Sequence, residues 1–144
     1  MSPSCDDVSR LPATVLFCLG IVDLVRGVMH TFLLRWSGVN IAGFDPVTTS
    51  SDQFLMLGAF GISNFLTGLV FVLISRKARD LSVYVLAAIP VAYLLGMIGI
   101  GLSRVQMESA FRGQYMMMVY LGVCIVTVVV VVVRRWSPTC RPGR

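Results

Sequence analysis

Three ionisable residues lie close together within one long apolar stretch of the chain, "LFCLGIVDLVRGVMHTFLLRW". They are Asp23, Arg26 and His30, and His30 is the only histidine. Residues spaced three and four apart fall on one side of an α-helix, because successive residues turn by about 100°. Gly20 and Gly27 share that side, whereas Leu, Val, Ile and Phe occupy the rest of the circumference. The spacing therefore predicts one polar, small-residue face on an otherwise apolar helix.

This face has to point away from lipid if the helix crosses a membrane. A charged side chain facing hydrocarbon at the bilayer centre costs about 2.5–3.5 kcal/mol, and such residues usually mark pathways for ions or solutes. Counting residues along the neighbouring apolar segments places two more polar side chains at a similar depth, and a loop adds two charges on the outer side. The predicted polar track of ligand- or ion-binding candidates comprises Asp23, Arg26, His30, Asn64, Tyr93, Arg104 and Glu108.

Three interpretations of the track remain open. As a binding or translocation site, it would use Asp23 for a cation or proton and Arg26 for an anion. As a structural network, it would pair Asp23 with Arg26, and His30 and Asn64 would complete the hydrogen bonds, because a buried charge is tolerated only when it is paired. As a catalytic site on a lipid-like substrate, it would use His30 as general acid and base.

The catalytic interpretation needs Asp23 to orient His30, and Arg26 or Arg104 to hold an anionic head group. Against it, the sequence contains no second histidine, no clustered metal ligands and no nucleophile motif. The four cysteines form no Cys-x-x-Cys pair, so they indicate neither a redox motif nor a zinc site. We therefore expect no metal and no cofactor, and we expect a protein that is not an enzyme.

The composition is that of an integral membrane protein. Of the 144 residues, 56% are hydrophobic and only 13% are charged, whereas soluble domains contain about 25% charged residues. The mean hydropathy is +0.83. The net charge of +5 does not indicate nucleic-acid binding, because the basic residues flank apolar runs, as membrane topology requires. The expected surroundings are a lipid bilayer.

Four apolar segments, each near the length of about 20 residues that crosses a hydrocarbon core, define the expected architecture. Only helices satisfy the backbone within lipid unless a barrel closes. We predict an all-α integral membrane protein, a four-transmembrane-helix antiparallel bundle without a soluble domain, in which residues 1–144 form one membrane domain. The predicted helices are residues 11–35, 52–75, 82–103 and 115–134.

The distribution of Lys and Arg predicts the orientation. Four spans place both termini and the second loop on one side, which carries eight basic residues: Arg10, Arg76, Lys77, Arg79, Arg134, Arg135, Arg141 and Arg144. The other side carries three: Arg35, Arg104 and Arg112. Because cytoplasmic loops are enriched in Lys and Arg, we predict a multi-pass protein of the inner or plasma membrane with both termini in the cytoplasm.

Small residues predict where the helices pack, because they let helix backbones approach each other in lipid. The second segment has two such faces, one formed by Ala59, Ser63 and Thr67 and the other by Gly61 and Gly68. The third segment has a stripe formed by Ala88, Ala92, Gly96, Gly99 and Ser103. The short loop "RKARD" predicts that the second and third helices are antiparallel neighbours, and Ser50 or Ser51 is expected to cap the second helix.

The fourth segment lacks charge within its apolar run and has few small residues. A helix that is hydrophobic on all sides suits contact with lipid or with another subunit. A second copy of the chain, or a larger membrane partner that this protein assists as an accessory subunit, is the expected neighbour under the latter interpretation. No nucleic-acid partner is expected.

Overall fold

The structure is a computed structural model that describes residues 5–45, 47–103 and 113–136. This part of the chain is helical and contains no strand. Its four long helices are α1 (Cys5–Phe32), α3 (Ser51–Lys77), α4 (Ser82–Leu102) and α5 (Gly113–Trp136). Each contains a stretch that is long and apolar enough to cross a membrane. The prediction of an all-helical chain with four long apolar helices is thereby confirmed.

The first helix ends earlier than predicted because its backbone breaks at Leu33, which has φ −108° and ψ 38°. The chain continues as the short helix α2 (Leu34–Ser37) and a π-helical turn η1 (Gly38–Ala42). Gly43 then adopts φ 79°, a left-handed conformation that costs glycine little because it has no Cβ. The segment after α1 therefore turns back over the end of the helix.

The start of α3 agrees with the predicted cap. Ser50 has an extended backbone, and its side chain accepts a hydrogen bond from the backbone N–H of Gln53. The Gln53 side chain in turn accepts from the backbone N–H of Ser50, which completes a capping box. This cap fixes the residue at which α3 begins.

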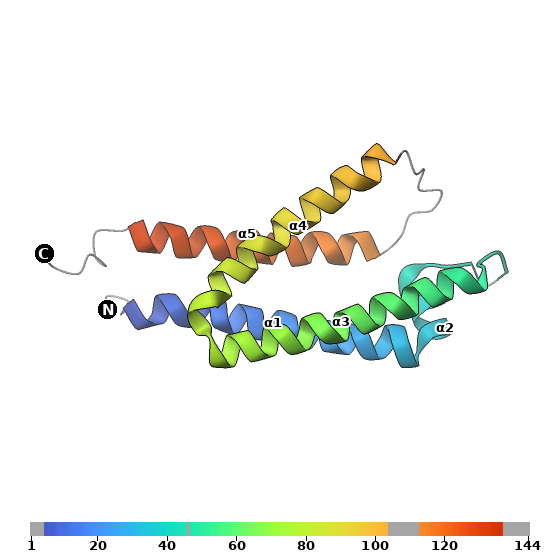
Figure 1. Cartoon of the computed structure of the whole chain (residues 1–144), viewed down its shortest axis with the longest axis horizontal. Coiled ribbons are helices and arrows are strands. Elements are labelled where there is room, and N and C mark those ends of the chain that lie inside the picture. Colours follow the sequence, from blue (N-terminus) through green and yellow to red (C-terminus); the bar gives the residue numbers. More distant parts are fainter. Residues whose placement is uncertain (1–4, 46, 104–112, 137–144) are drawn as a thin grey trace, which may run out of the picture.

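The four long helices alternate in direction (Figure 1). At one end α1 begins, α3 turns into α4 through the 3-10 turn η2 (Arg79–Leu81), and α5 ends. We call this the basic end, because Arg10, Arg76, Arg79 and Arg134 lie there. We call the opposite end, where α2 and η1 lie, the α2 end. The alternation places the start of α1, the end of α5 and the second loop at the same end, as four spans require.

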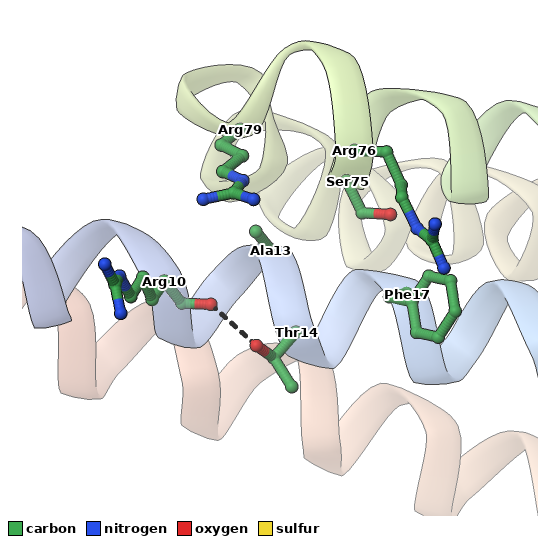
Figure 2. A pocket seen from close by; sticks show the side chains of 7 residues that line it. All are labelled: Arg10, Ala13, Thr14, Phe17, Ser75, Arg76 and Arg79. Carbon is green, nitrogen blue, oxygen red and sulfur yellow. Dashed lines mark hydrogen bonds between the residues drawn. The ribbon is translucent and has the colours of Figure 1, made fainter.

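Helices α1 and α3 pack through two pairs of glycines in an antiparallel register. A Cβ on Gly68 would lie 2.8 Å from the carbonyl oxygen of Gly20, and a Cβ on Gly27 would lie 3.2 Å from that of Gly61. On both helices the glycines are seven residues apart, which is the repeat that keeps one face against a partner helix. The same register places Ala13 opposite Ser75 at the basic end (Figure 2). The predicted packing face of Gly61 and Gly68 is therefore confirmed.

The main hydrophobic core joins all four long helices in the half nearer the basic end. It consists of Leu16 and Leu19 of α1, Phe71 of α3, Leu86 of α4 and Cys124 of α5. Leu16, Leu86 and Cys124 have no exposed surface. The core therefore fixes the helices at one end, and the polar face of α1 continues from it toward the α2 end.

Helix α4 does not follow the predictions. Its buried residues, Ser82, Val83 and Leu86, all lie in its first two turns, and beyond them the helix diverges from the others (Figure 1). It contacts α5 and α1 more than α3. The second and third helices are therefore antiparallel, as predicted, but they are not packed against each other as neighbours. Once the glycine face of α3 is covered by α1, α4 meets α3 mainly at the turn.

The stripe of small residues on α4 is also not a packing face in the described part of the chain. Ala88, Ala92 and Gly96 are exposed, and a Cβ on Gly96 or Gly99 would meet no atom within 4 Å. Likewise Ala59 and Ser63 of α3 are exposed. Small residues permit close approach but do not attract a partner helix. Of the small-residue faces predicted on α3 and α4, only that of the heptad-spaced glycines packs against another helix in the described part of the chain.

Helix α5 is less uniform than its sequence suggests. Cys124, Thr127 and Val131 are buried, whereas Val119, Val126 and Val133 are more than half exposed. The buried positions are three and four residues apart, so one side of α5 faces the other helices. The interpretation of this helix as one suited on all sides to lipid or to another subunit is therefore wrong for this face.

Candidate functional site

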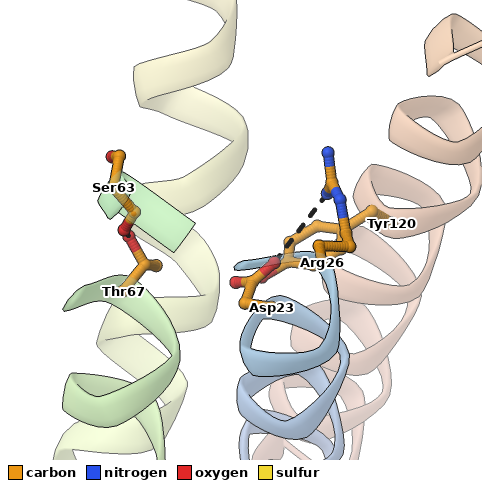
Figure 3. A network of polar contacts seen from close by, with 5 residues as sticks. All are labelled: Asp23, Arg26, Ser63, Thr67 and Tyr120. Atoms are coloured by element: carbon orange, nitrogen blue, oxygen red, sulfur yellow. Dashed lines mark hydrogen bonds and ion pairs between the residues drawn. The ribbon is translucent and has the colours of Figure 1, made fainter. Parts of the chain in front are cut away.

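Asp23 of α1 lies buried at the centre of the candidate site, with 4% of its surface exposed. Its Oδ2 atom accepts a hydrogen bond of 3.0 Å from the hydroxyl of Tyr120, which comes from α5 (Figure 3). Its Oδ1 atom lies 3.8 Å from a guanidinium nitrogen of Arg26. A carboxylate accepts about four hydrogen bonds, so the two neighbours leave part of this capacity unused.

Arg26 lies one turn beyond Asp23 and is only loosely held. The 3.8 Å separation from Asp23 exceeds the 2.7–2.9 Å of a charge-assisted hydrogen bond. The guanidinium carbon lies 5.6 Å from the ring centroid of Phe60, which is within the range of a cation–π contact. The buried Nε atom has no hydrogen-bond partner in the part of the chain that the structure describes. Arg26 therefore retains donors that point into the interior of the bundle.

His30, one further turn along α1, is buried against the α2 end of the molecule. Its Nδ1 atom lies 3.3 Å from the Ser37 hydroxyl, which donates its own proton to the carbonyl of Leu34. We therefore assign the Nδ1–H tautomer, which donates to Ser37 and leaves Nε2 as an acceptor. The described partner of His30 is thus Ser37, and Asp23 does not orient the imidazole as the catalytic interpretation required.

A cavity of about 190 Å³ adjoins Asp23 and Arg26. Side chains of all four long helices line it, including Asn64 of α3, Tyr93 of α4 and Tyr120 of α5. Asn64 is buried, and its Nδ2 atom has no hydrogen-bond partner within residues 5–45, 47–103 and 113–136. Buried amides are almost always hydrogen-bonded. The cavity therefore presents two unsatisfied donor groups, from Asn64 and Arg26, in a space large enough for a water molecule or a small polar group.

A second, larger cleft of about 430 Å³ continues from this cavity toward the α2 end. The two spaces share Arg26, Phe60 and Met117 as lining residues. Arg26 and His30 are polar groups at its inner part, and Asp52 and Gln53 lie where α3 begins. Most of the remaining wall is apolar and is formed by Ile41, Ala42, Phe44, Met56, Leu57, Phe60, Met116 and Met117.

The structure brings five of the seven predicted site residues into one connected region. Asp23, Arg26, Asn64 and Tyr93 line the small cavity, and Arg26 and His30 line the larger cleft. The two remaining candidates, Arg104 and Glu108, lie outside the described residues. The structural network expected around Asp23 is present only in part, because Asn64 does not join it and His30 bonds elsewhere.

Tyr120 was not among the predicted site residues, although among the described residues it makes the one good hydrogen bond to the Asp23 carboxylate. The signal was present in the fourth apolar segment, where Tyr120 precedes Cys124 by four residues and Thr127 by seven. This spacing defines one helical face. Ser37 was also not predicted as a site residue. Its contact with His30 depends on the backbone break at Leu33, which no sequence pattern indicates.

Neither the described residues nor the comparisons assign a known chemistry to the site. In the described part of the chain, no three His, Cys, Asp or Glu side chains lie close enough together to hold a metal ion. Comparison of the chain with family models, curated proteins and solved structures gives no match in any of the three. The shape and the hydrogen-bonding groups of the two connected spaces are therefore the features that indicate a function.

Proposed function

We propose that this chain is a multi-pass membrane protein that binds a small amphipathic solute in the cleft between α1, α3 and α5, and that both termini lie in the cytoplasm. Four helices of suitable length and hydropathy support insertion. The excess of Lys and Arg at the basic end supports the orientation, because cytoplasmic loops carry such an excess. The cleft would then open toward the external side.

The observation that carries the binding proposal is the unused hydrogen-bonding capacity of Arg26. Its Nε atom and the Nδ2 atom of Asn64 are both buried donors without a hydrogen-bond partner among the described residues. A closed structural network would satisfy its own donors, because each unsatisfied buried group costs about 1–3 kcal/mol. Donors require an acceptor, so the solute group that fits beside Arg26 is a carboxylate or another small hydrogen-bond acceptor.

The apolar wall of the larger cleft indicates that the rest of the same solute is apolar. Phe60, Met56 and Leu57 of α3 and Met117 of α5 face the cleft, and methionines adapt to ligands of irregular shape. A volume of about 430 Å³ falls within the usual 300–1,000 Å³ of ligand sites, which combine an apolar wall with a few polar groups. An apolar carboxylate would place its head at Arg26 and its chain toward the α2 end.

Thermal unfolding of the purified protein in nanodiscs tests this proposal with three probes of equal chain length: octanoate, octanol and octylamine. A ligand that binds the folded state raises the unfolding temperature. We expect octanoate to stabilise the wild-type protein more than the other two. In Arg26→Gln, the affinity for octanoate should fall about ten-fold or more, because a hydrogen bond to a charged group contributes about 1.5–3 kcal/mol.

Arg134→Gln is the matched control, because Arg134 lies at the basic end and is exposed. This variant should bind octanoate as the wild type does. Equal stabilisation by octanol would show that only the chain length matters. Retention of octanoate binding in Arg26→Gln would place the carboxylate elsewhere. Either result would contradict the proposed site.

A further inference from the structure

We propose that the basic end of the bundle binds the phosphate group of an anionic phospholipid in a pocket between α1 and the α3–α4 turn. This proposal rests on the membrane insertion proposed above but not on the binding of a solute at Arg26. The pocket has a volume of about 460 Å³. It lies at the opposite end of α1 from the cleft described above, and the two share no residue.

The pocket collects positive charge from separate elements. Arg10 comes from α1, Arg76 from the last turn of α3 and Arg79 from η2 (Figure 2). None of the seven residues that line the pocket is acidic. The three arginines give the pocket a positive charge, which a bound anion would offset. Basic pockets between membrane helices on the cytoplasmic side characteristically bind the head groups of anionic lipids.

Arg76 is oriented by an aromatic side chain. Its guanidinium carbon lies 4.9 Å from the ring centroid of Phe17 on α1. The ring holds the guanidinium by a cation–π contact and does not consume hydrogen-bond donors. The N–H groups therefore remain available in the planar fork that matches the oxygens of a phosphate.

The two hydroxyl groups of the pocket do not compete for this role. Thr14 donates its hydroxyl proton to the carbonyl oxygen of Arg10, and Ser75 donates to that of Val72. Each hydroxyl thus bonds within its own helix. The donors for an anion are therefore the arginines, which identifies them as the residues to change.

The surface below the pocket favours a lipid over free phosphate. Toward the middle of the bundle, exposed apolar side chains follow on both helices: Ile21 and Val25 on α1, and Leu69 and Leu73 on α3. A phosphate held at the basic end would lie where the apolar part of each helix begins. The acyl chains of the same lipid could then continue along these side chains, which free phosphate cannot do.

Native mass spectrometry of the full chain in a neutral detergent tests the proposal by titration with phosphatidylglycerol, with phosphatidylcholine of the same acyl chains, and with inorganic phosphate as competitor. We expect phosphatidylglycerol to bind more tightly than phosphatidylcholine. Arg76→Gln and Arg79→Gln should each weaken phosphatidylglycerol binding about five-fold. Arg76→Lys keeps the charge but loses the planar guanidinium, so its affinity for phosphatidylglycerol should lie between those of the wild type and Arg76→Gln.

Two variants serve as controls, Arg134→Gln for charge at the same end and Arg26→Gln for the separate solute site. Both should bind phosphatidylglycerol as the wild type does, and the latter separates a failure of this proposal from a failure of the proposed function.

The proposal is overturned if Arg134→Gln weakens binding as much as Arg79→Gln, or if the two lipids bind equally. It is also overturned if equimolar inorganic phosphate displaces the lipid, since the site would then be one for free phosphate. Circular dichroism verifies that each variant is folded, and Arg76→Lys supplies the comparison if Arg76→Gln is not.

Discussion

At the scale of single residues, the candidate site combines a satisfied contact with unsatisfied ones. The hydroxyl of Tyr120 donates to Asp23 and thereby connects α5 to α1. Arg26 and Asn64, in contrast, have buried donor atoms beside the same cavity that no described residue satisfies. The same face of α1 therefore both holds the helices together and leaves donors for a solute.

The stabilising part of this face is tested by Tyr120→Phe. Loss of the phenol hydroxyl removes the hydrogen bond to Asp23 and leaves the ring in place, so the free energy of unfolding should fall by about 1 kcal/mol. Denaturant unfolding in mixed micelles, followed by circular dichroism, measures this change. The matched control is Tyr84→Phe, because Tyr84 is 65% exposed. If both variants lose the same stability, the hydrogen bond to Asp23 contributes nothing of its own.

At this scale the sequence predicts which side of a helix a residue faces better than it predicts which residues it contacts. A helical period was enough to place Asp23, His30, Gly20 and Gly27 on one face, and all four are buried. It was not enough to find which groups they meet. The partner of His30 depends on a backbone break at Leu33, and a break of this kind leaves no periodic signal.

At the scale of helices, the pairing of α1 with α3 depends on close backbone contact at the glycines. Gly68→Ala would place a Cβ 2.8 Å from the carbonyl oxygen of Gly20 and 2.9 Å from the backbone nitrogen of Leu24. Backbone atoms cannot move aside as a side chain can, so the two helices would have to separate. We expect a loss of about 1–3 kcal/mol in the free energy of unfolding, which is typical of overpacking.

Gly96→Ala is the matched control for this prediction, because its Cβ would meet no atom within 4 Å. Alanine has the higher helix propensity, so this variant should unfold no more easily than the wild type. The same denaturant titration in micelles measures both. A Gly96→Ala variant that is as unstable as Gly68→Ala would show that a partner covers this part of α4.

The existence of the helices was predictable, whereas their packing partners were not. Hydropathy alone identifies the four helices, because apolar runs of about 20 residues are distinctive. Ser50 was also a predictable helix start, because its side chain has the right chemistry at the right position. The small residues of α4 and the glycines of α3 look equivalent in sequence. What distinguishes the glycine face of α3 is that Gly20 and Gly27 of α1 have the same seven-residue spacing and pack against it.

At the scale of the whole molecule, the two ends of the bundle have different characters. The basic end collects arginines around an open pocket whose described lining residues include no acid. The α2 end contains a largely apolar cleft that leads inward to Arg26. In the proposed orientation, the first would face lipid head groups on the cytoplasmic side and the second would receive a solute from the outside. The proposed function requires that the solute enters from the α2 end and reaches Arg26.

Modification of a single cysteine at position 117 by a membrane-impermeant thiol reagent tests this claim most directly. Met117 lines both the cleft and the inner cavity, whereas Val119 at nearly the same level is 68% exposed on the outside of the bundle. Met117→Cys and Val119→Cys are compared in a cysteine-free background, in right-side-out vesicles, with and without octanoate. We predict that the cysteine at 117 reacts faster than that at 119, and that octanoate but not octanol slows its modification. Equal rates at the two positions, or a rate at 117 that octanoate leaves unchanged, would contradict it.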